Sequence, residues 1–308
     1  MINRVLIRLK LIQIVYAYYQ NGDKTIKAAE KELLFSLSKA HDLYNYLLLL
    51  MVAVTEYAQD RINKSKSKLA PTAKDLNPNL KFVQNKFVAQ LAKNKQLLEY
   101  CESQKRSWND DQNSVKDVYE KIIASDIYKE YMADKDSSYK EDREFWRKLY
   151  KNFICANETL DESLEDMSLY WNDDKEIVDT FVMKTIKRFD DKKGVDQPLL
   201  PEYKDDEDQE FAVRLLRRAI ENSDYYRSLI GEHTKNWELD RIALMDVVLM
   251  QCAIAEILSF PNIPLNVTFN EYLDLAKLYS TQKSGAFING TLDSIVNQLK
   301  KEGKLIKN

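Results

Sequence analysis

Apolar residues recur at the spacing of an amphipathic helix through the C-terminal third of the chain. Between residues 240 and 259 they follow the i, i+3, i+4, i+7 pattern of one helix face, at Met245, Val248, Leu249 and Cys252. Pro261 and Pro264 end this helix, because proline lacks an N–H and its ring clashes with the preceding turn. The pattern therefore predicts a helix that stops before residue 261.

Two more helices are predicted beyond these prolines. Thr268 and Glu271 have the spacing of a capping box, in which each side chain bonds to the other residue's backbone N–H, and they predict a helix start. One face of that helix is apolar, at Tyr272, Leu275, Ala276 and Tyr279. A polar break over 280–285 precedes a last helix with an apolar stripe at Ile288, Leu292, Ile295, Val296 and Leu299.

The upstream chain is also predicted to be helical. Residues 2–20 are apolar on nearly every side, which is typical of a helix at the centre of a bundle. Residues 24–61 predict two helices, or one broken helix, and further helices are expected over 82–101 and 115–132. Because no segment has the pattern of paired strands, we predict an all-α protein.

A helical unit is duplicated within the chain at a constant offset of 66 residues. The matched positions are Glu144 with Glu210, Phe145 with Phe211, Leu149 with Leu215, Ile154 with Ile220, Leu164 with Ile230, Trp171 with Trp237, Asp174 with Asp240 and Val182 with Val248. Each copy predicts a helix, a short break, a second helix, the Trp and Asp, and a third helix. Residues 190–208 link the copies and are expected to form a mobile surface loop, because they contain glycine, two prolines and an acidic run.

Composition places this chain among ordinary cytosolic proteins. Its 46 Lys and Arg against 49 Asp and Glu give a net charge of −3, which argues against a general nucleic-acid coat but allows a local basic patch. The three cysteines lie far apart, which is typical of a reducing compartment. Cations interrupt the apolar N-terminus and the run 44–58 is too short to span a membrane. We therefore expect a cytoplasmic protein without a membrane segment.

The residues that could carry catalysis do not form a recognisable set. His41 and His233 are the only histidines, and neither has a second ligand at metal-binding spacing. No phosphate-binding loop, nucleophile elbow or dinucleotide fingerprint is present in the sequence. We expect no enzymatic activity, no metal site and no cofactor.

Phe287 is the most informative residue of the last helix. It points about 125° away from the centre of the apolar stripe and follows Lys283 and Ser284 closely. One interpretation is that Phe287 packs on a neighbouring helix of its own domain. The other is an exposed aromatic platform beside a cation and free helix N–H groups, which suits a stacked base and its phosphate.

Several linked motifs resemble the NusB family over about sixty residues. In chain order they are Asp240-Arg241, Asp246, Ala255-Glu256-Ile257-Leu258, Ile263-Pro264, Val267, Asn270-Glu271, Leu275-Ala276-Lys277 and the run from Phe287 to Asp293, which matches the family's F-x-N-G-x-L-D signature. Arg8, Gln13 and Tyr16 resemble the family's N-terminal helix. The family usually has more arginines there than the two at Arg4 and Arg8.

The resemblance implies an all-α NusB-like helical bundle that binds boxA-type single-stranded RNA. In this family the partner is a small-subunit ribosomal protein, called NusE in this role. Their complex joins the elongating RNA polymerase and opposes premature termination, above all on ribosomal RNA operons. It also implies a NusE contact near Tyr16 and Asp246. Some members form homodimers, so a homodimer is possible here.

The candidate RNA-binding residues combine the two matched segments. We expect charge from the N-terminal helix and from the start of the last helix, and recognition from Phe287. The complete set is Arg4, Arg8, Lys10, Lys277, Lys283, Ser284, Phe287 and Asn289. Alternatively, the arginines form salt bridges at the end of a core helix, Tyr16 is a core residue and Asp246 is a structural carboxylate.

The chain is about twice as long as a typical member of the family. We expect residues 1–60 and 205–308 to form the NusB-like core, with 61–204 as an inserted helical region. Two function hypotheses follow. The chain is an RNA-binding antitermination factor, or it is a helical adaptor that kept the protein contact but has weak or no RNA binding.

Overall fold

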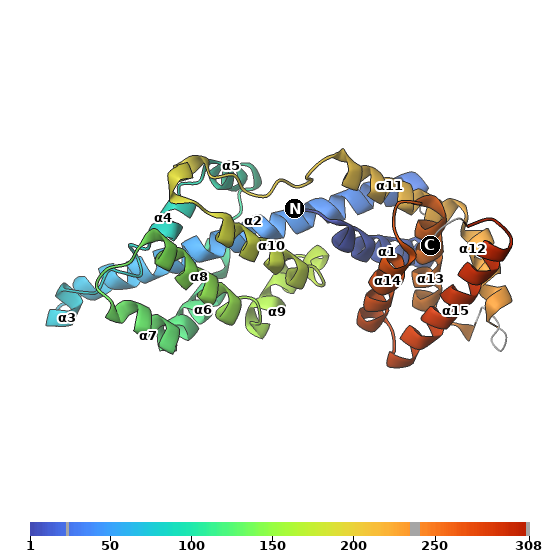
Figure 1. Cartoon of the computed structure of the whole chain (residues 1–308). Helices are drawn as coiled ribbons and strands as arrows, with labels where there is room; N and C mark the ends of the chain where they lie inside the picture. Colours follow the sequence, from blue (N-terminus) through green and yellow to red (C-terminus); the bar gives the residue numbers. More distant parts are fainter. Residues whose placement is uncertain (23–24, 235–240, 306–308) are drawn as a thin grey trace. The chain divides into compact units, whose positions relative to one another are not determined.

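The computed structural model describes residues 1–22, 25–234 and 241–305. Every regular element within those ranges is a helix, as the sequence pattern predicts (Figure 1). The chain forms two compact units. Unit 1 comprises Met1 and Lys39–Glu202, and unit 2 comprises Ile2–Ser38 and Tyr203–Asn308.

Unit 2 is a bundle built around α13 (Leu244–Ser259). Nearly the whole of α13 is buried, because α1, α11, α12, α14 and α15 all pack against it. The surrounding helices are α1 (Arg4–Asn21), the first part of α2 (Ile26–Lys66), α11 (Asp206–Glu221), α12 (Ser223–His233), α14 (Leu265–Tyr279) and α15 (Gln282–Lys301). The α1 helix is buried over most of its length, as its all-round apolar pattern predicts.

Unit 1 packs shorter helices with the remainder of α2. In chain order they are α3 (Ala73–Leu76), α4 (Lys86–Leu91), α5 (Lys95–Gln104), η1 (Trp108–Asp111), α6 (Gln112–Ala124), α7 (Asp126–Ala133), α8 (Tyr139–Phe153), α9 (Glu158–Met167), η2 (Leu169–Trp171), α10 (Lys175–Arg188) and η3 (Asp191–Asp196). Aromatic side chains fill much of the core, with Trp146 and Tyr150 on α8 fully buried. A capping box between Ser138 and Glu141 starts α8.

The helix α2 runs unbroken for 41 residues, so the predicted break within 24–61 is wrong. No glycine or proline occurs between Ile26 and Lys66, and nothing in the backbone therefore stops the helix. The division between the units falls at Ser38 and Lys39 within this helix. A continuous helix carries no local signal of such a division. The expected extent of the NusB-like core, residues 1–60 and 205–308, stays a prediction.

The predicted capping box at Thr268 and Glu271 is wrong. Helix α14 begins one turn earlier, at Leu265, with Pro264 at the N-cap, where its missing N–H removes no helical hydrogen bond. Thr268 is instead fully buried and donates a 2.7 Å hydrogen bond to Glu256 Oε1, and Glu271 lies 3.4 Å from Arg8. The break before the last helix is also shorter than predicted, because α15 begins at Gln282.

The duplicated unit has the same order of helices in both copies. The first copy is α8, α9 and α10 in unit 1, and the second is α11, α12 and α13 in unit 2. Trp171 of the first copy is buried, and its indole N–H donates to the carbonyl of Lys39 at 2.8 Å. Its counterpart Trp237, together with Asp240, lies outside the described residues.

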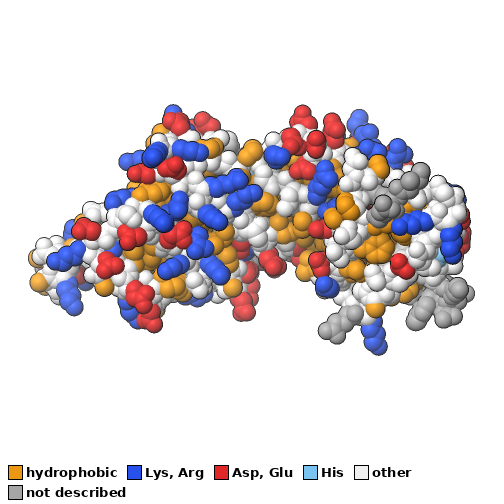
Figure 2. Space-filling view, viewed as in Figure 1, with side chains coloured by type: hydrophobic (Ala, Val, Ile, Leu, Met, Phe, Trp, Pro, Cys, Tyr) orange, Lys and Arg blue, Asp and Glu red, His pale blue; other side chains and the backbone are white. Residues whose placement is uncertain are grey.

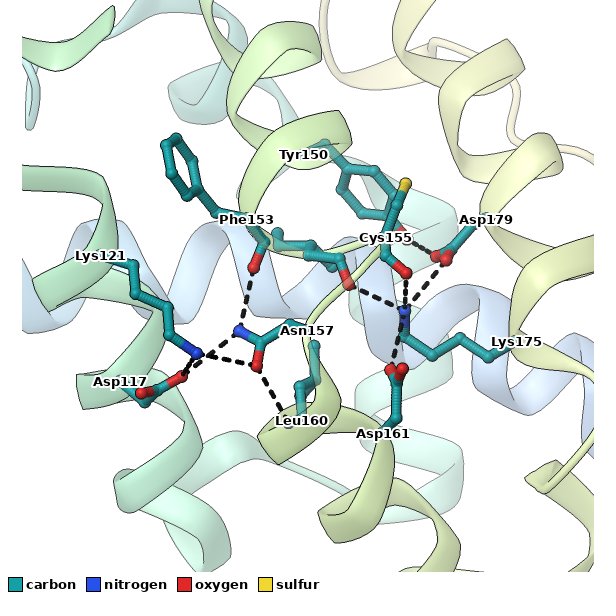
Figure 3. Close-up of polar contacts among 11 residues, drawn as sticks. Asp117, Lys121, Tyr150, Phe153, Cys155, Asn157, Leu160, Asp161, Lys175 and Asp179 are labelled. Atoms are coloured by element: carbon teal, nitrogen blue, oxygen red, sulfur yellow. Dashed lines mark hydrogen bonds and ion pairs between the residues drawn. The ribbon is translucent and has the colours of Figure 1, made fainter. Parts of the chain in front are cut away.

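A buried ammonium group joins the helices of the first copy (Figure 3). Lys175 Nζ donates to the carbonyl oxygens of Ile154 at 2.8 Å and Cys155 at 3.0 Å. It also lies 3.0 Å from Asp179 Oδ2 and 3.0 Å from Asp161 Oδ1. Burial raises the pKa of Asp179, and the Lys175 charge works in the opposite direction. Because the ammonium group of Lys175 bonds to carbonyl oxygens and pairs with carboxylates, we interpret the cluster as a structural contact between these helices.

The linker between the copies is held to the helices of unit 1. Gln90 Nε2 donates to the carbonyl oxygens of Asp190 and Gly194, at 3.0 and 2.8 Å. Asn94 donates to Gln197 O at 2.7 Å. Part of the segment also forms the helix η3. The expectation of a mobile loop over 190–208 overlooked these long-range side-chain bonds.

Candidate RNA- and partner-binding surface

Two residues of extended chain connect α14 to α15 and bring several predicted site residues together. Ser280 caps the end of α14, and Thr281 precedes the first turn of α15. Ser280 donates a hydrogen bond to Asp246 Oδ1 on the first turn of α13, and its Oγ lies 2.9 Å from Ser284 Oγ. Asp246 is only 6% exposed. This carboxylate therefore anchors the connection to the central helix of unit 2.

A hollow of about 390 Å³ lies beside this connection. We call it the α15 hollow, and its lining residues are Arg241, Ile242, Ala243, Asp246, Lys283, Ser284 and Phe287. The Phe287 ring is half-buried in its wall, while Lys283 and Arg241 are exposed at its side. All of these residues belong to unit 2.

The start of α15 adds positive potential to the α15 hollow. The first turn of a helix has backbone N–H groups without helical partners and the positive end of the helix dipole. Thr281 provides no side-chain cap, and Lys283 forms no ion pair with another residue in the described ranges. The arrangement offers an anion both a cation and N–H donors, next to an aromatic surface.

The signature residues after Phe287 have separate roles. Ile288 and Leu292 are buried in the core, whereas Asn289 and Gly290 are exposed. A Cβ atom added at Gly290 would meet nothing within 4 Å, so close packing of helices does not require a glycine at this position. Lys277, on α14, is exposed and pairs with Asp274 at 2.7 Å.

The cations of the N-terminal helix are mostly buried or ion-paired within unit 2. Arg8 is buried and makes a bidentate ion pair with Glu256, at 2.8 and 2.9 Å. Lys10 is only 1% exposed. Arg4 is partly exposed, lies 3.4 Å from Asp208 and sits over the ring of Phe211. Neither Arg8 nor Lys10 presents its charge to solvent, and no residue of α1 is among those that line the α15 hollow.

Tyr16 lies on α1 and is half-buried. Its hydroxyl accepts a hydrogen bond of 3.1 Å from Gln20 Nε2. The other residue of the N-terminal resemblance, Gln13, donates to Tyr279 OH at 2.8 Å and so joins α1 to α14. Tyr16 therefore has a surface that a partner could contact, whereas Gln13 has an internal role.

Sequence reasoning missed three residues that line the α15 hollow. Arg241, Ile242 and Ala243 come just before α13. The sequence singled out Arg241 only as part of a motif, because the contact between this segment and α15 joins positions about forty residues apart. Ser280 was likewise treated as part of a polar break.

The described ranges contain no group of three or more His, Cys, Asp or Glu side chains that could hold a metal ion. No helix in the same ranges is long and apolar enough to cross a membrane. The fold and the α15 hollow together describe an all-α protein with a hollow lined by Phe287, two cations and polar side chains.

Comparisons with known proteins agree with this description. The model of the NusB family matches residues 178–297, which include α11 to α14 and most of α15. The chain is 36% identical over 108 residues to the transcription antitermination protein NusB of Salinibacter ruber, covering 35% of this chain and 68% of that protein. It is 43% identical over 98 residues to NusB of Desulfatibacillum aliphaticivorans, covering 32% of this chain and 68% of that protein. The chain belongs to the NusB family.

Other relatives match over a smaller part of their length. NusB of Chloroherpeton thalassium is 40% identical over 99 residues, which are 32% of this chain and 47% of that protein. The chain thus spans about half the length of that relative. A solved structure of T. maritima NusB is 28% identical, covers 47% of this chain and 90% of that chain, and has a TM-score of 0.31.

Proposed function

We propose that the protein is a cytoplasmic, non-enzymatic transcription antitermination factor that binds boxA-type single-stranded RNA at the α15 hollow. It acts with a small-subunit ribosomal protein in the NusE role and supports transcription of ribosomal RNA by joining the elongating RNA polymerase indirectly. The observation that carries this proposal is the meeting of Phe287, Lys283 and the start of α15 in one hollow.

The chemistry of the α15 hollow suits an unpaired nucleotide. An unstacked base can lie against the half-buried ring of Phe287, since stacking on an aromatic side chain tolerates any base. Its phosphate can then approach Lys283 and the N–H groups of the first turn of α15. Asp246, held by Ser280, fixes the position of this turn relative to α13.

A protein partner is proposed to contact Tyr16 on α1. The ring is only half-buried and its hydroxyl is already satisfied by Gln20, so an apolar contact would not leave a polar atom unpaired. Asp246 is proposed to act indirectly, because its carboxylate is buried beneath the connection between α14 and α15. A homodimer remains a separate proposal that the same surface could serve.

The structure also favours a second candidate, the adaptor without strong RNA affinity. Arg8 and Lys10 are buried, and Arg4 is partly neutralised by Asp208, so α1 supplies little free positive charge. RNA binding without these groups depends on few contacts, and few phosphate contacts mean low affinity at physiological salt.

A gel-shift titration distinguishes the two candidates. A boxA-like RNA and a scrambled RNA of the same composition are titrated with the full chain, each with and without the NusE ribosomal protein. The antitermination proposal expects boxA-like RNA to bind more tightly than the scrambled RNA, and more tightly still with the partner present. Capture of the partner without any preference for boxA-like RNA would support the adaptor.

A further inference from the structure

Basic side chains collect on one face of unit 1. The face is formed by α8, α10 and η3, and Figure 2 shows Lys and Arg side chains gathered over these elements. We define the basic face as its exposed cations, which are Lys140, Lys148, Lys151, Lys184, Lys187, Arg188, Lys192 and Lys193. Within the described ranges, none of these eight side chains forms an ion pair.

Nearby carboxylates do not neutralise the basic face. Glu144 pairs with Arg147 at 2.6 Å, and Glu141 accepts a backbone hydrogen bond from Ser138 in its capping box. Asp190 accepts a backbone hydrogen bond from Lys192 N. Among the described residues, none of these three acids forms an ion pair with one of the eight cations, and the cations outnumber the acids in this part of the chain.

Charge is separated within unit 1, although the whole chain is slightly acidic. Helix α9 carries five carboxylates and no cation, at Glu158, Asp161, Glu162, Glu165 and Asp166. Segments 139–153 and 184–193 together carry ten Lys and Arg against five Asp and Glu. A random mixture of surface charges would cancel locally, whereas this separation produces a directed positive potential.

The packing of α8 against α10 holds the basic face in place. Near the start of α8, Arg143 Nη1 donates to the carbonyl of Phe189 at 2.7 Å, just beyond the end of α10. At the opposite ends, Lys175 of α10 bonds to the carbonyl of Ile154. The two helices are therefore antiparallel. Their buried faces meet each other, and their cations lie on the outward faces.

We propose that the basic face binds the sugar–phosphate backbone of RNA without sequence preference. This inference rests on the proposed RNA-binding function and adds a second, independent contact in unit 1. Lysine is a flexible point charge that suits a phosphate in many orientations, and phosphate contacts carry no base information. The 15 residues of α8 extend over roughly 22 Å, enough for several successive phosphates.

The test uses the full chain and a fluorescently labelled oligouridine of thirty nucleotides. Fluorescence anisotropy measures its affinity at several salt concentrations for the parent and for the triple variant Lys184→Ala, Lys187→Ala and Arg188→Ala. The variant is expected to bind about 100-fold more weakly at 0.1 M salt, with a salt slope smaller by about 2 units. A second triple variant, Lys140→Ala, Lys148→Ala and Lys151→Ala, should reproduce the effect from α8.

The matched control removes the same charge from exposed lysines that already have partners. These are Lys68, Lys116 and Lys129, which pair with Asp75, Glu120 and Asp126. Their replacement by alanine should leave affinity for oligouridine within about twofold of the parent, since their charges are locally neutralised. Far-ultraviolet circular dichroism confirms that every variant is folded.

Three results would overturn the proposal. The first is that the parent does not bind oligouridine. The second is that both triple variants bind it as tightly as the control variant does. The third is that the triple variants lose only a salt-dependent self-association, measured by light scattering. The third result would indicate that the basic face binds the acidic helix α9 of a second copy of this chain. Failure of this proposal would not contradict the proposed RNA site at the α15 hollow, because the preference for boxA-like over scrambled RNA is measured in a separate experiment.

Discussion

Arg8 on α1 and Glu256 on α13 form a buried bidentate ion pair, with Nε to Oε2 at 2.8 Å and Nη2 to Oε1 at 2.9 Å. Thr268 also donates to this carboxylate, and Tyr272 lies 3.4 Å from it. Burial alone would lower the pKa of Arg8, but hydrogen bonding and attraction to Glu256 outweigh it, and the pKa is raised. The pair joins the N-terminal helix to the C-terminal bundle of unit 2.

Breaking this pair should strongly destabilise unit 2. Glu256→Gln removes the buried counter-charge of Arg8 and leaves only the partly exposed Glu271 near it, so the free energy of unfolding should fall by about 3 kcal/mol. Arg4→Ala is the control, because the Arg4–Asp208 pair is partly exposed and worth at most about 1 kcal/mol. Urea denaturation followed by far-ultraviolet circular dichroism gives both values. Equal losses for the two variants would contradict the role assigned to Arg8.

Lys175 should be equally important in unit 1. Lys175→Met removes the ammonium donor from two carbonyl oxygens and from Asp179, which keeps only the neutral Tyr150 hydroxyl, and we expect a loss of about 3–5 kcal/mol at neutral pH. Lys121→Met is the control, since Lys121 is partly exposed where it pairs with Asp117 (Figure 3). Three of the four tryptophans lie in unit 1, so fluorescence during urea denaturation follows it.

The loss caused by Lys175→Met should also depend on pH. Without the ammonium group, the already raised pKa of Asp179 should rise further, and the folded state then prefers the protonated acid. Stability is therefore regained as pH falls toward the ordinary range of aspartate. The variant should approach the parent near pH 4, and a loss that stays constant from pH 7 to pH 4 would contradict this account.

The protein should lose stability at alkaline pH as the buried Tyr44 hydroxyl ionises. Burial raises its pKa from 10.0 to about 12, and its hydroxyl bonds to Thr185 Oγ1 at 2.6 Å and accepts from Leu200 N at 3.1 Å. Its contribution is complete below pH 10 and is lost between pH 10 and 12, by about 3 kcal/mol. Tyr44→Phe should be less stable at pH 7 by about 1 kcal/mol but should lose less in alkali. An unchanged alkaline transition would exclude Tyr44 as its source.

Tyr16 tests the proposed protein contact without disturbing the core. Because its ring is only half-buried, Tyr16→Ala should keep the fold while reducing capture of the NusE ribosomal protein in a pull-down by about tenfold or more, the effect of losing an interface aromatic residue. Tyr225→Ala is the control, since Tyr225 is an exposed tyrosine of unit 2 that no proposed contact includes. If Tyr225→Ala lowers capture as much as Tyr16→Ala, the contact is not specific to this face.

The helices were predictable where one apolar stripe determines them. The end of α13 at Ser259 follows from Pro261, and the buried stripe of α15 follows from the spacing of Ile288, Leu292 and Ile295. The continuity of α2 was missed although no glycine or proline interrupts it, because the apolar spacing alone does not distinguish one long helix from two. The start of α14 was missed because Thr268 serves Glu256, which lies on another helix.

The candidate binding surface was only partly predictable, because it too depends on contacts between distant parts of the chain. The helical wheel placed Phe287 away from the core, and the structure places its half-buried ring in the wall of the α15 hollow. The wheel could not show that Arg8 is buried, since its partner Glu256 is 248 residues away in the chain. Long-range pairs of this kind have no local signature in the sequence.

The account's central claim is that RNA binds at the α15 hollow, and Phe287 and Lys283 test it most directly. Binding of boxA-like RNA is measured by fluorescence anisotropy across a salt series for the parent, Phe287→Ala and Lys283→Ala, with Phe35→Ala as the control because Phe35 is an exposed phenylalanine of unit 2. Phe287→Ala should cost about 1–3 kcal/mol with an unchanged salt slope. Lys283→Ala should reduce the slope by about one unit, and Phe35→Ala should change neither quantity. Parent-like affinity and slope in both hollow variants would contradict the claim.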